Sequence, residues 1–239
     1  VFDLRTSRRN LLKKQYKVTT SSSLKTLTQK TDIIVLAVKP QNIKALLKEL
    51  CPLLGCKHLI ISIAAGIDTS FLKTHLGKNA KIVRAMPNTP ALVRHGFTGL
   101  FGTSSLTQKE FKQTQRIFTA VGDIAIVHRE SDLDVITALS GSGPAFVFYF
   151  IEAFIKAGQK LGLKKSLVQK AVFTTFEGAL KLLKHSQASP ESLRKKVTSK
   201  GGTTEAGLKQ MKKNRMAQGL VQMLQAATKR ATTLRRDFK

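Results

Sequence analysis

One segment of the chain has the residue types of an anion-binding loop. Lys196 to Leu208 reads KVTSKGGTTEAGL. Within it a pair of glycines is followed by a pair of threonines, with which a pattern typical of a helix begins. Glycines at a helix start leave backbone N–H groups accessible at the positive end of the helix dipole, so the segment could hold a phosphate or a carboxylate. It does not match G-x-x-x-x-G-K-[ST], which disfavours an ATP phosphate loop. The simpler alternative is a turn between helices in which Thr203 or Thr204 caps the second helix.

Three other segments place small residues where a nucleotide cofactor could lie against the backbone. AVKP (Ala37 to Pro40), IAAG (Ile63 to Gly66) and AMPNTP (Ala85 to Pro90) each end a short run rich in β-branched residues. If these runs are parallel strands, the segments meet at one edge of a sheet, where dinucleotides bind in such folds. Each segment alone is more typical of a turn, but together they predict a cofactor site.

The first residues, VFDLRTSRRN, resemble the end of a strand followed by a basic loop. Arginine and hydroxyl side chains suit the 2′-phosphate of NADPH, so Arg5 and Thr6 favour NADPH. The neighbouring Asp3 leaves NADH open. An ordinary exposed basic turn explains this segment alone equally well.

These segments must be positioned by two different kinds of structure. Up to about His128, short apolar runs alternate with helical patterns, which predicts a parallel sheet with helices on both faces. The expected strands are Asp32 to Val38, His58 to Ala64, Lys81 to Met86, Gly96 to Gly102 and Ile124 to His128. After His128, long stretches with apolar residues at i, i+3, i+4 and i+7 predict a helical bundle. Ala145 to Ile155 is apolar nearly all round, so we expect it to be buried, with a partner chain as one candidate for the covering surface.

Composition narrows the functional classes. The 239 residues include 41 Lys and Arg against 14 Asp and Glu, a formal net charge of +27 that attracts polyanions. The basic residues are spread along the chain and no zinc-finger, RRM or KH pattern is present, so solvated basic faces are favoured over nucleic-acid binding. No apolar run approaches the ~18 residues of a membrane helix, which predicts a cytoplasmic protein without a membrane partner. Cys51 and Cys56 lack further ligands for zinc, so we expect free thiols and no metal site.

The junction between the two halves reads ESDLDVITALSGSGPAFVF. Its acids, Glu130, Asp132 and Asp134, are expected by default to stabilise a helix N-terminus. SGSGP (Ser140 to Pro144) has the residues of a glycine hinge with Pro144 in the first turn of a helix, or of a backbone surface that a substrate can approach closely.

Six blocks in this order carry a specific resemblance: DIIVLAVKPQ, IISIAAGI, VRAMPNTPALV, VITALSGSGPAFVF, AGQKLGL and VTSKGGTTEAGL. Together they resemble the pyrroline-5-carboxylate reductase family, which performs the last step of proline synthesis. The resemblance implies a Rossmann-type NAD(P)-binding domain at residues 1–128 and an all-α domain for substrate binding and dimerisation at residues 129–239. It also implies reduction of 1-pyrroline-5-carboxylate to proline with NADPH, or with NADH, by a homodimer or a larger assembly of dimers.

The resemblance also assigns site residues. The positions matching cofactor contacts are Arg5, Thr6, Ala37, Val38, Lys39, Pro40, Ile63, Ala64, Ala65 and Asn88. Substrate contacts match Glu130, Gly202, Thr203 and Thr204, and the catalytic candidates are Thr137 and Thr204. Three departures lie in the glycine segment: Lys200 stands where the family usually has proline, Glu205 where an apolar residue is common, and Lys196 where some members have asparagine.

A larger departure concerns the start of the sequence. It begins where the second Rossmann strand should be ending, so the first strand, the G-x-G-x-x-G turn and the first helix of the family do not appear. We therefore expect a fragment of a longer chain; without a preceding segment, we expect weak cofactor binding. The alternative hypotheses are a truncated, inactive subunit that dimerises through its helices and a basic nucleic-acid-binding module.

Overall fold

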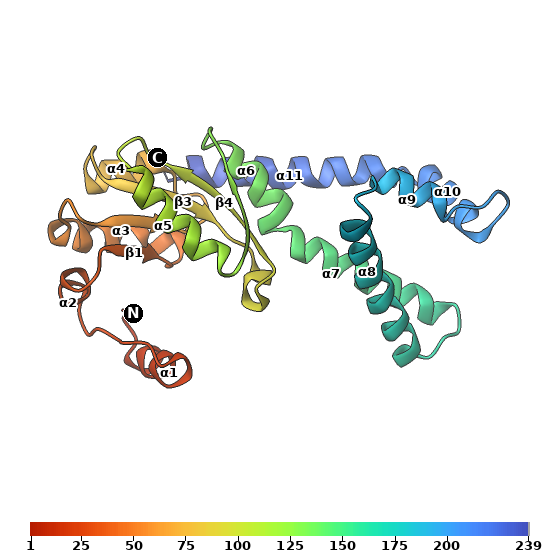
Figure 1. Ribbon diagram of the computed structural model, residues 1–239, viewed down its shortest axis with the longest axis horizontal. Helices are drawn as coiled ribbons and strands as arrows, with labels where there is room; N and C mark the ends of the chain where they lie inside the picture. Colours follow the sequence, from red (N-terminus) through yellow and green to blue (C-terminus); the bar gives the residue numbers. More distant parts are fainter. Residues whose placement is uncertain (239) are drawn as a thin grey trace. The chain divides into compact units, whose positions relative to one another are not determined.

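The computed structural model describes residues 1–238, and they form two compact units. The sheet unit comprises Val1–Gly141 together with the C-terminal residues from Ala227 onward, and the helical unit comprises Ser142–Ala226. Figure 1 shows the strands and their flanking helices in the first unit and the long helices of the second. The fold class expected from the sequence, an α/β Rossmann-type domain followed by an all-α region, is confirmed.

A five-stranded mixed sheet forms the centre of the sheet unit. The strands lie in the order β1 (Ile33–Leu36), β2 (Leu59–Ser62), β3 (Lys81–Met86), β4 (Gly96–Gly102) and β5 (Gly122–Ile126). The first three strands are parallel, as expected, but β4 runs antiparallel to β3, and β5 is parallel to β4, so the expectation of an all-parallel sheet is wrong from β4 onward. The residues that follow β1, β2 and β3 therefore leave the sheet at one common edge.

Alternating residues of the strands build two cores, one on each face of the sheet. Ile60 and Ile82 belong to the core that α3 (Pro40–Leu50) and α4 (Thr69–Leu76) cover. Ile61 and Val83 point to the other face, where Phe118 of α5 (Gln108–Thr119) covers them. Successive residues of a strand point to opposite faces of the sheet, and β2 is buried along its whole length. Both faces are therefore covered, which confirms the expected helices on both faces.

The strand boundaries agree closely with the sequence patterns, apart from the N-terminal segment. The runs expected at 81–86 and 96–102 form β3 and β4 with the same bounds, and the others are a few residues shorter or shifted. Residues 1–4 are not in a strand, and the expected basic loop is the helix α1 (Thr6–Tyr16). The helix can form because its segment contains neither glycine nor proline. Residues 1–4 form no strand because a strand requires a neighbouring strand as its partner. Val35 of the edge strand β1 is 45 % exposed.

The helical unit buries little of its own apolar surface. Its helices are α7 (Gly143–Lys160), α8 (Lys165–Ser186), α9 (Pro190–Lys196), α10 (Thr203–Lys213) and most of α11 (Met216–Arg236). Within residues 142–226 the one buried side chain is Val168 of α8. Phe148 and Tyr149 of α7 are 65 % and 70 % exposed, so the expected burial of this helix is not achieved within one chain.

The same apolar helix corrects another expectation. The continuous helical stretch Asp132–Lys160 is long and apolar enough to cross a membrane by length and composition alone. The stretch is not one uninterrupted apolar run in the sequence, because it extends over α6 (Asp132–Ile136), the π-helix η3 (Thr137–Gly141) and α7, with the polar residues Ser140 and Ser142 between its apolar parts. Among the described residues, one such helix is weak support for a membrane span.

The remaining elements complete the sheet unit. They are α2 (Leu24–Gln29) and the two 3-10 helices η1 (Cys51–Leu53) and η2 (Thr89–Val93). Cys51 and Cys56 are free thiols, as expected.

Candidate functional site

The common edge beyond β1, β2 and β3 brings together most of the predicted cofactor residues. Ala37–Pro40 leads from β1 into α3, and Ile63–Ala65 follows β2. Leu36 pairs with Ser62 in the sheet, so the two segments start side by side. Ala37 and Lys39 are exposed, and Ile63 and Ala65 are half-buried, which leaves them accessible to a ligand.

The start of α3 suits a phosphate group. Lys39 is the N-cap residue, its side chain makes no capping hydrogen bond, and Pro40 occupies the first turn. Pro40 has no N–H and the Asn42 N–H donates to the Lys39 carbonyl at 2.9 Å, so the Gln41 N–H and the Lys39 ammonium are the groups that favour an anion here. The residues at this edge therefore fit the phosphates of a dinucleotide. The small side chains of the neighbouring alanines leave room for the dinucleotide to contact the protein backbone.

The segment between β2 and α4, Ile63–Asp68, is held in one conformation and is called the β2–α4 loop below. At its start the Ala64 N–H donates to the hydroxyl of the buried Ser62, at 3.4 Å. Gly66 has a φ of +77°, in the left-handed region that favours glycine. A Cβ at Gly66 would lie 3.2 Å from Leu234 of α11, so the end of α11 packs directly against this loop.

Arg5 and Thr6 lie at the start of α1. Arg5 is the N-cap residue, its side chain is 76 % exposed, and its backbone N–H donates to Asp3. The Thr6 hydroxyl accepts a hydrogen bond from Arg9 at 2.9 Å. An exposed guanidinium at an uncapped helix start has the chemistry that a phosphate requires, so this segment stays a prediction for the 2′-phosphate.

Asn88 connects three parts of the sheet unit. Its side-chain nitrogen donates to the carbonyl oxygen of Ser140 at 3.2 Å and to the Ser140 hydroxyl at 3.0 Å, and its oxygen accepts from the Phe97 N–H at 2.9 Å. The amide thereby ties the loop after β3 to η3 and to β4. Asn88 can shape a cofactor pocket through these contacts, by fixing the backbone around it.

Glu130 lies in the turn before α6, and both of its carboxylate oxygens accept hydrogen bonds within the chain. Oε1 accepts from the backbone N–H of Thr69 at 2.8 Å, and Oε2 accepts from the Thr69 hydroxyl at 2.6 Å. Arg84 also donates to Oε1 at 3.3 Å. Thr69 is the first residue of α4, so Glu130 sits at the positive end of that helix. The contact between Glu130 and the substrate stays a prediction.

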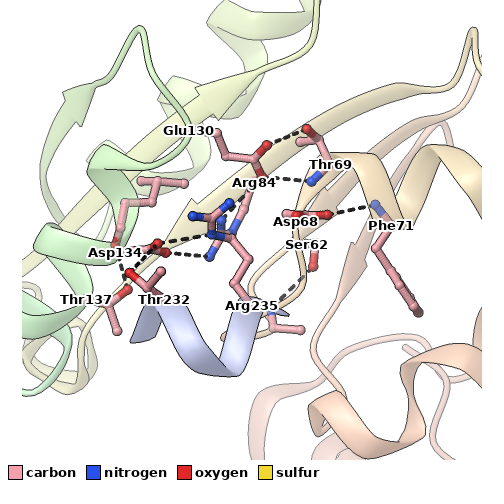
Figure 2. A network of polar contacts seen from close by, with 12 residues as sticks. Ser62, Asp68, Thr69, Phe71, Arg84, Glu130, Asp134, Thr137, Thr232 and Arg235 are labelled. Carbon is pink, nitrogen blue, oxygen red and sulfur yellow. Dashed lines mark hydrogen bonds and ion pairs between the residues drawn. The ribbon is translucent and has the colours of Figure 1, made fainter. Parts of the chain in front are cut away.

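Arg84 lies at the centre of a buried cluster of charges (Figure 2). Its side chain is 3 % exposed and pairs with Glu130 and with Asp134, whose Oδ1 is 3.8 Å away. The other oxygen of Asp134 accepts from Arg235 at 3.0 Å and from the Thr232 hydroxyl at 3.1 Å, both on α11. Asp134 Oδ1 has no hydrogen-bond partner among the described residues, so the charge of Arg84 is its main compensation.

The three acids of the junction therefore have different roles. Asp132 pairs with the exposed Arg129, in keeping with the default role of a helix-start acid. Glu130 and Asp134 instead bind partners from β3, α4 and α11. The sequence signal that was missed is Arg84, an arginine inside the apolar run KIVRAM. A charge in a buried strand requires a partner of opposite charge, and acids are scarce in this chain.

Thr137 is the first residue of the π-helix η3. Its hydroxyl donates to the Leu133 carbonyl at 2.7 Å, so the proton of this group is already engaged and its lone pairs remain to accept. Single π turns inside helices are frequent at functional sites. The predicted role of Thr137 near the substrate therefore requires a substrate that donates a hydrogen bond.

Gly202, Thr203 and Thr204 belong to the helical unit, in the turn between α9 and α10. Gly202 is the N-cap of α10, so neither threonine caps the helix as the simpler alternative expected. The Gly202 N–H donates to the Ser199 carbonyl at 3.1 Å and is therefore occupied. No side chain caps α10, so the N–H groups of its first residues remain for a ligand. The Gly201 N–H donates to Glu205 at 2.7 Å, so Glu205 braces the glycine turn.

Two family models match this chain. The one described as pyrroline-5-carboxylate reductase dimerisation matches residues 130–234, and the one described as NADP oxidoreductase coenzyme F420-dependent matches residues 3–66. The first falls on the helices with the large exposed apolar surface, and the second includes both segments at the edge of β1 and β2.

Curated relatives carry one name. The chain is 40 % identical to pyrroline-5-carboxylate reductase from Pseudomonas aeruginosa over 203 residues, which cover 85 % of this chain and 74 % of the relative. It is 34 % identical to pyrroline-5-carboxylate reductase 2 from Bacillus subtilis over 227 residues, covering 95 % of this chain and 81 % of the relative.

Solved structures agree. A pyrroline-5-carboxylate reductase from Coxiella burnetii superposes with a TM-score of 0.92 at 36 % identity, covering 98 % of this chain and 87 % of that one. The Plasmodium falciparum pyrroline carboxylate reductase with NADP bound superposes with a TM-score of 0.85 at 34 % identity. The match covers 91 % of this chain and 82 % of that one. With its sheet edge, its glycine turn and its helical unit all matched, the chain belongs to the pyrroline-5-carboxylate reductase family.

Proposed function

We propose that this chain reduces 1-pyrroline-5-carboxylate to proline with NADPH as the hydride donor. The observation that carries the proposal is the sheet edge, where small accessible residues meet an uncapped helix start beside Lys39. This edge matches the NADP oxidoreductase model, and a structural relative at 34 % identity contains NADP. When bound, NADPH supplies the hydride, and the chain's own residues hold and orient the reactants.

The cofactor residues divide by the part of NADPH that each would hold. Arg5 and Thr6 are proposed for the 2′-phosphate, and Ala37–Pro40 for the phosphates at the start of α3. The backbone of Ile63–Ala65 would lie along the cofactor. Asn88 would shape the pocket through its hydrogen bonds to Ser140 and Phe97.

The substrate is a cyclic imine with a carboxylate, and each group has a proposed partner. The N–H groups of Thr203 and Thr204 at the start of α10 would bind the carboxylate, with Gly202 allowing its close approach. The protonated imine is a hydrogen-bond donor, and the Thr137 hydroxyl, whose own proton is directed to Leu133, would accept from it. This contact would keep the ring nitrogen protonated while its neighbouring carbon receives the hydride.

The quaternary structure follows from the exposed helices. The chain forms a homodimer through its helical unit, which matches the dimerisation model. A partner's helices, rather than lipid, would cover Phe148 and Tyr149 of α7. A larger assembly of dimers and a cytoplasmic location are further parts of this proposal.

Turnover tests the function directly. Incubation of the purified protein with NADPH and 1-pyrroline-5-carboxylate should consume NADPH and yield proline, which mass spectrometry identifies. Thr137→Val should lower kcat by about tenfold or more, because it removes the hydroxyl next to the imine, and Thr137→Ser should retain most activity. Absence of proline from protein that binds NADPH would refute the proposal.

A further inference from the structure

We propose that Glu130 is a positioning residue, which fixes the β2–α4 loop in the conformation that receives NADPH. The inference rests on the proposed function, because that proposal assigns Ile63–Ala65 to the cofactor. It replaces the expected role of Glu130 as a substrate ligand with one that acts through Thr69.

Glu130 binds the far end of the β2–α4 loop at two points. Its carboxylate accepts from the N–H and from the hydroxyl of Thr69, at 2.8 and 2.6 Å. Thr69 is 8 % exposed, so these bonds form away from bulk water. Hydrogen bonds to a charged acceptor in a largely buried place are among the stronger ones in proteins. A two-point contact also fixes the rotamer of Thr69 and the direction of the first turn of α4.

The rest of the loop leaves little freedom once Thr69 is fixed. Ile67 is fully buried in the core under α3 and α4, and its N–H donates to the Ala64 carbonyl at 3.4 Å. Gly66 packs against Leu234, and Ala64 is bonded to Ser62. The half-buried Ile63 and Ala65 therefore take their positions from contacts on either side of them. Glu130 provides the contact on the α4 side.

Arg84 holds Glu130 in place for this task. Figure 2 shows the guanidinium of Arg84 between Glu130 and Asp134, and Asp134 also accepts hydrogen bonds from Arg235 and Thr232 of α11. The charge of Arg84 compensates the buried carboxylate of Glu130, which would otherwise be costly to desolvate. The Glu130 side chain is 18 % exposed, so a small part of it faces solvent.

The hydrogen-bond geometry separates positioning from substrate binding. Both oxygens of Glu130 are occupied by donors of this chain, and a substrate ammonium or iminium would have to share or displace them. A substrate ligand is expected to affect the KM of pyrroline-5-carboxylate. A residue that positions the β2–α4 loop is expected to affect the affinity for NADPH.

Glu130→Gln is the first test. The amide keeps one acceptor oxygen and replaces the other by a donor, so one of the two bonds from Thr69 is lost or reversed. We expect the Kd of NADPH, measured by titration of the purified protein, to rise about tenfold, with the KM of pyrroline-5-carboxylate within about twofold. Asp132→Asn is the matched control, because it removes a nearby carboxylate that pairs with the exposed Arg129, and both constants should stay unchanged.

Thr69→Val is the second test, and it leaves the charged cluster intact should Glu130→Gln fail to fold. It removes the hydroxyl at nearly constant shape, so the Kd of NADPH should rise about threefold to tenfold, while Thr69→Ser should restore the wild-type value. The inference is overturned if Glu130→Gln raises the KM of pyrroline-5-carboxylate and leaves the Kd of NADPH unchanged, or if both variants bind NADPH normally. Absence of turnover in the wild-type protein would instead contradict the proposed function.

Discussion

The sheet unit and the helical unit use their apolar and acidic residues in different ways. The sheet unit covers both faces of its sheet and fully buries residues such as Ile43, Leu47 and Ile61. The helical unit buries Val168 and exposes Phe148 and Tyr149. The sheet unit thus has a core of its own, whereas the helical unit is half of a core that a second copy completes.

The acidic residues also differ between the sheet unit and the helical unit. In the sheet unit Glu130 and Asp134 are largely buried, and each contacts more than one partner. In the helical unit Glu152, Glu177, Glu191 and Glu205 each pair with a lysine one turn further along an exposed helix. Exposed pairs of this kind add little stability, so the stability of the helical unit depends on dimer contacts. Substitutions in the two units should therefore differ in whether their effects depend on dimerisation.

Phe148→Asp should have the largest effect. In the proposed dimer the partner's helices would cover this exposed ring, so the substitution would remove apolar contact and place an unpaired charge in the interface. We expect the dimer Kd to rise by more than about a hundredfold, measured by analytical ultracentrifugation. Lys181→Asp, on the exposed face of α8 in its pair with Glu177, is the control and should leave the protein dimeric. A dimeric Phe148→Asp protein would show that another surface forms the interface.

Leu47→Ala should destabilise the sheet unit whether or not the protein is dimeric. Leu47 of α3 is fully buried in the core against the sheet. Removing its methyl groups should lower the free energy of unfolding by about 2–5 kcal/mol, measured by urea denaturation. The loss should be the same at low and high protein concentration in the transition of the sheet unit. A loss that disappears at high concentration would mean that dimerisation also supports this core.

Glu110→Gln should have a smaller effect that depends on pH. The hydrogen bond from Lys81, followed by that from the Thr107 N–H, lowers the pKa of Glu110 to about 2 from its ordinary value of 4.5. Because the folded-state pKa is the lower one, this stabilisation is present above pH ~4.5 and is lost as the pH falls toward about 2. The variant should lose about 1 kcal/mol at neutral pH, since water screens part of the ion pair.

The pH dependence supplies the decisive comparison for Glu110. Between pH 4.5 and 2 the wild-type protein should lose more stability than Glu110→Gln, as measured by thermal unfolding across that range. Glu177→Gln, in an exposed pair with Lys181, is the control in the helical unit and should change the Tm far less at every pH. Equal changes in the two variants would remove the distinction between the pairs of the two units.

Lys200→Pro should have the smallest effect, and it concerns binding. Lys200 is exposed, and no hydrogen bond from its N–H is among the contacts of the described residues, so proline would remove none. Proline would restrict the unbound turn before Gly201 and should lower the KM of pyrroline-5-carboxylate about twofold to fivefold. An unchanged KM, in steady-state assays at saturating NADPH, would mean that the brace from Glu205 to Gly201 already fixes the turn.

Local patterns were sufficient to predict the strands, because β-branched runs such as Lys81–Met86 are typical of strands, but they did not predict that β4 runs antiparallel to β3. The same patterns predicted which segments share the cofactor edge, since parallel strands end on one side. They could not predict that residues 1–4 lie outside the sheet, which depends on a neighbouring strand. They also could not pair Glu130 with Thr69, 61 residues away, because the contact arises only from the packing of α4 against the turn before α6.

The helix α11 begins in the helical unit, and its last turns belong to the sheet unit. Its contact from Arg235 to Asp134 joins residues 101 positions apart in sequence. During synthesis on the ribosome, the strands of the sheet are therefore complete long before Arg235, the second cation at Asp134, is made. Until then Asp134 has Arg84 as its counter-charge, and the β2–α4 loop lacks Leu234 at Gly66. The NADPH site should consequently be among the last parts of the protein to mature.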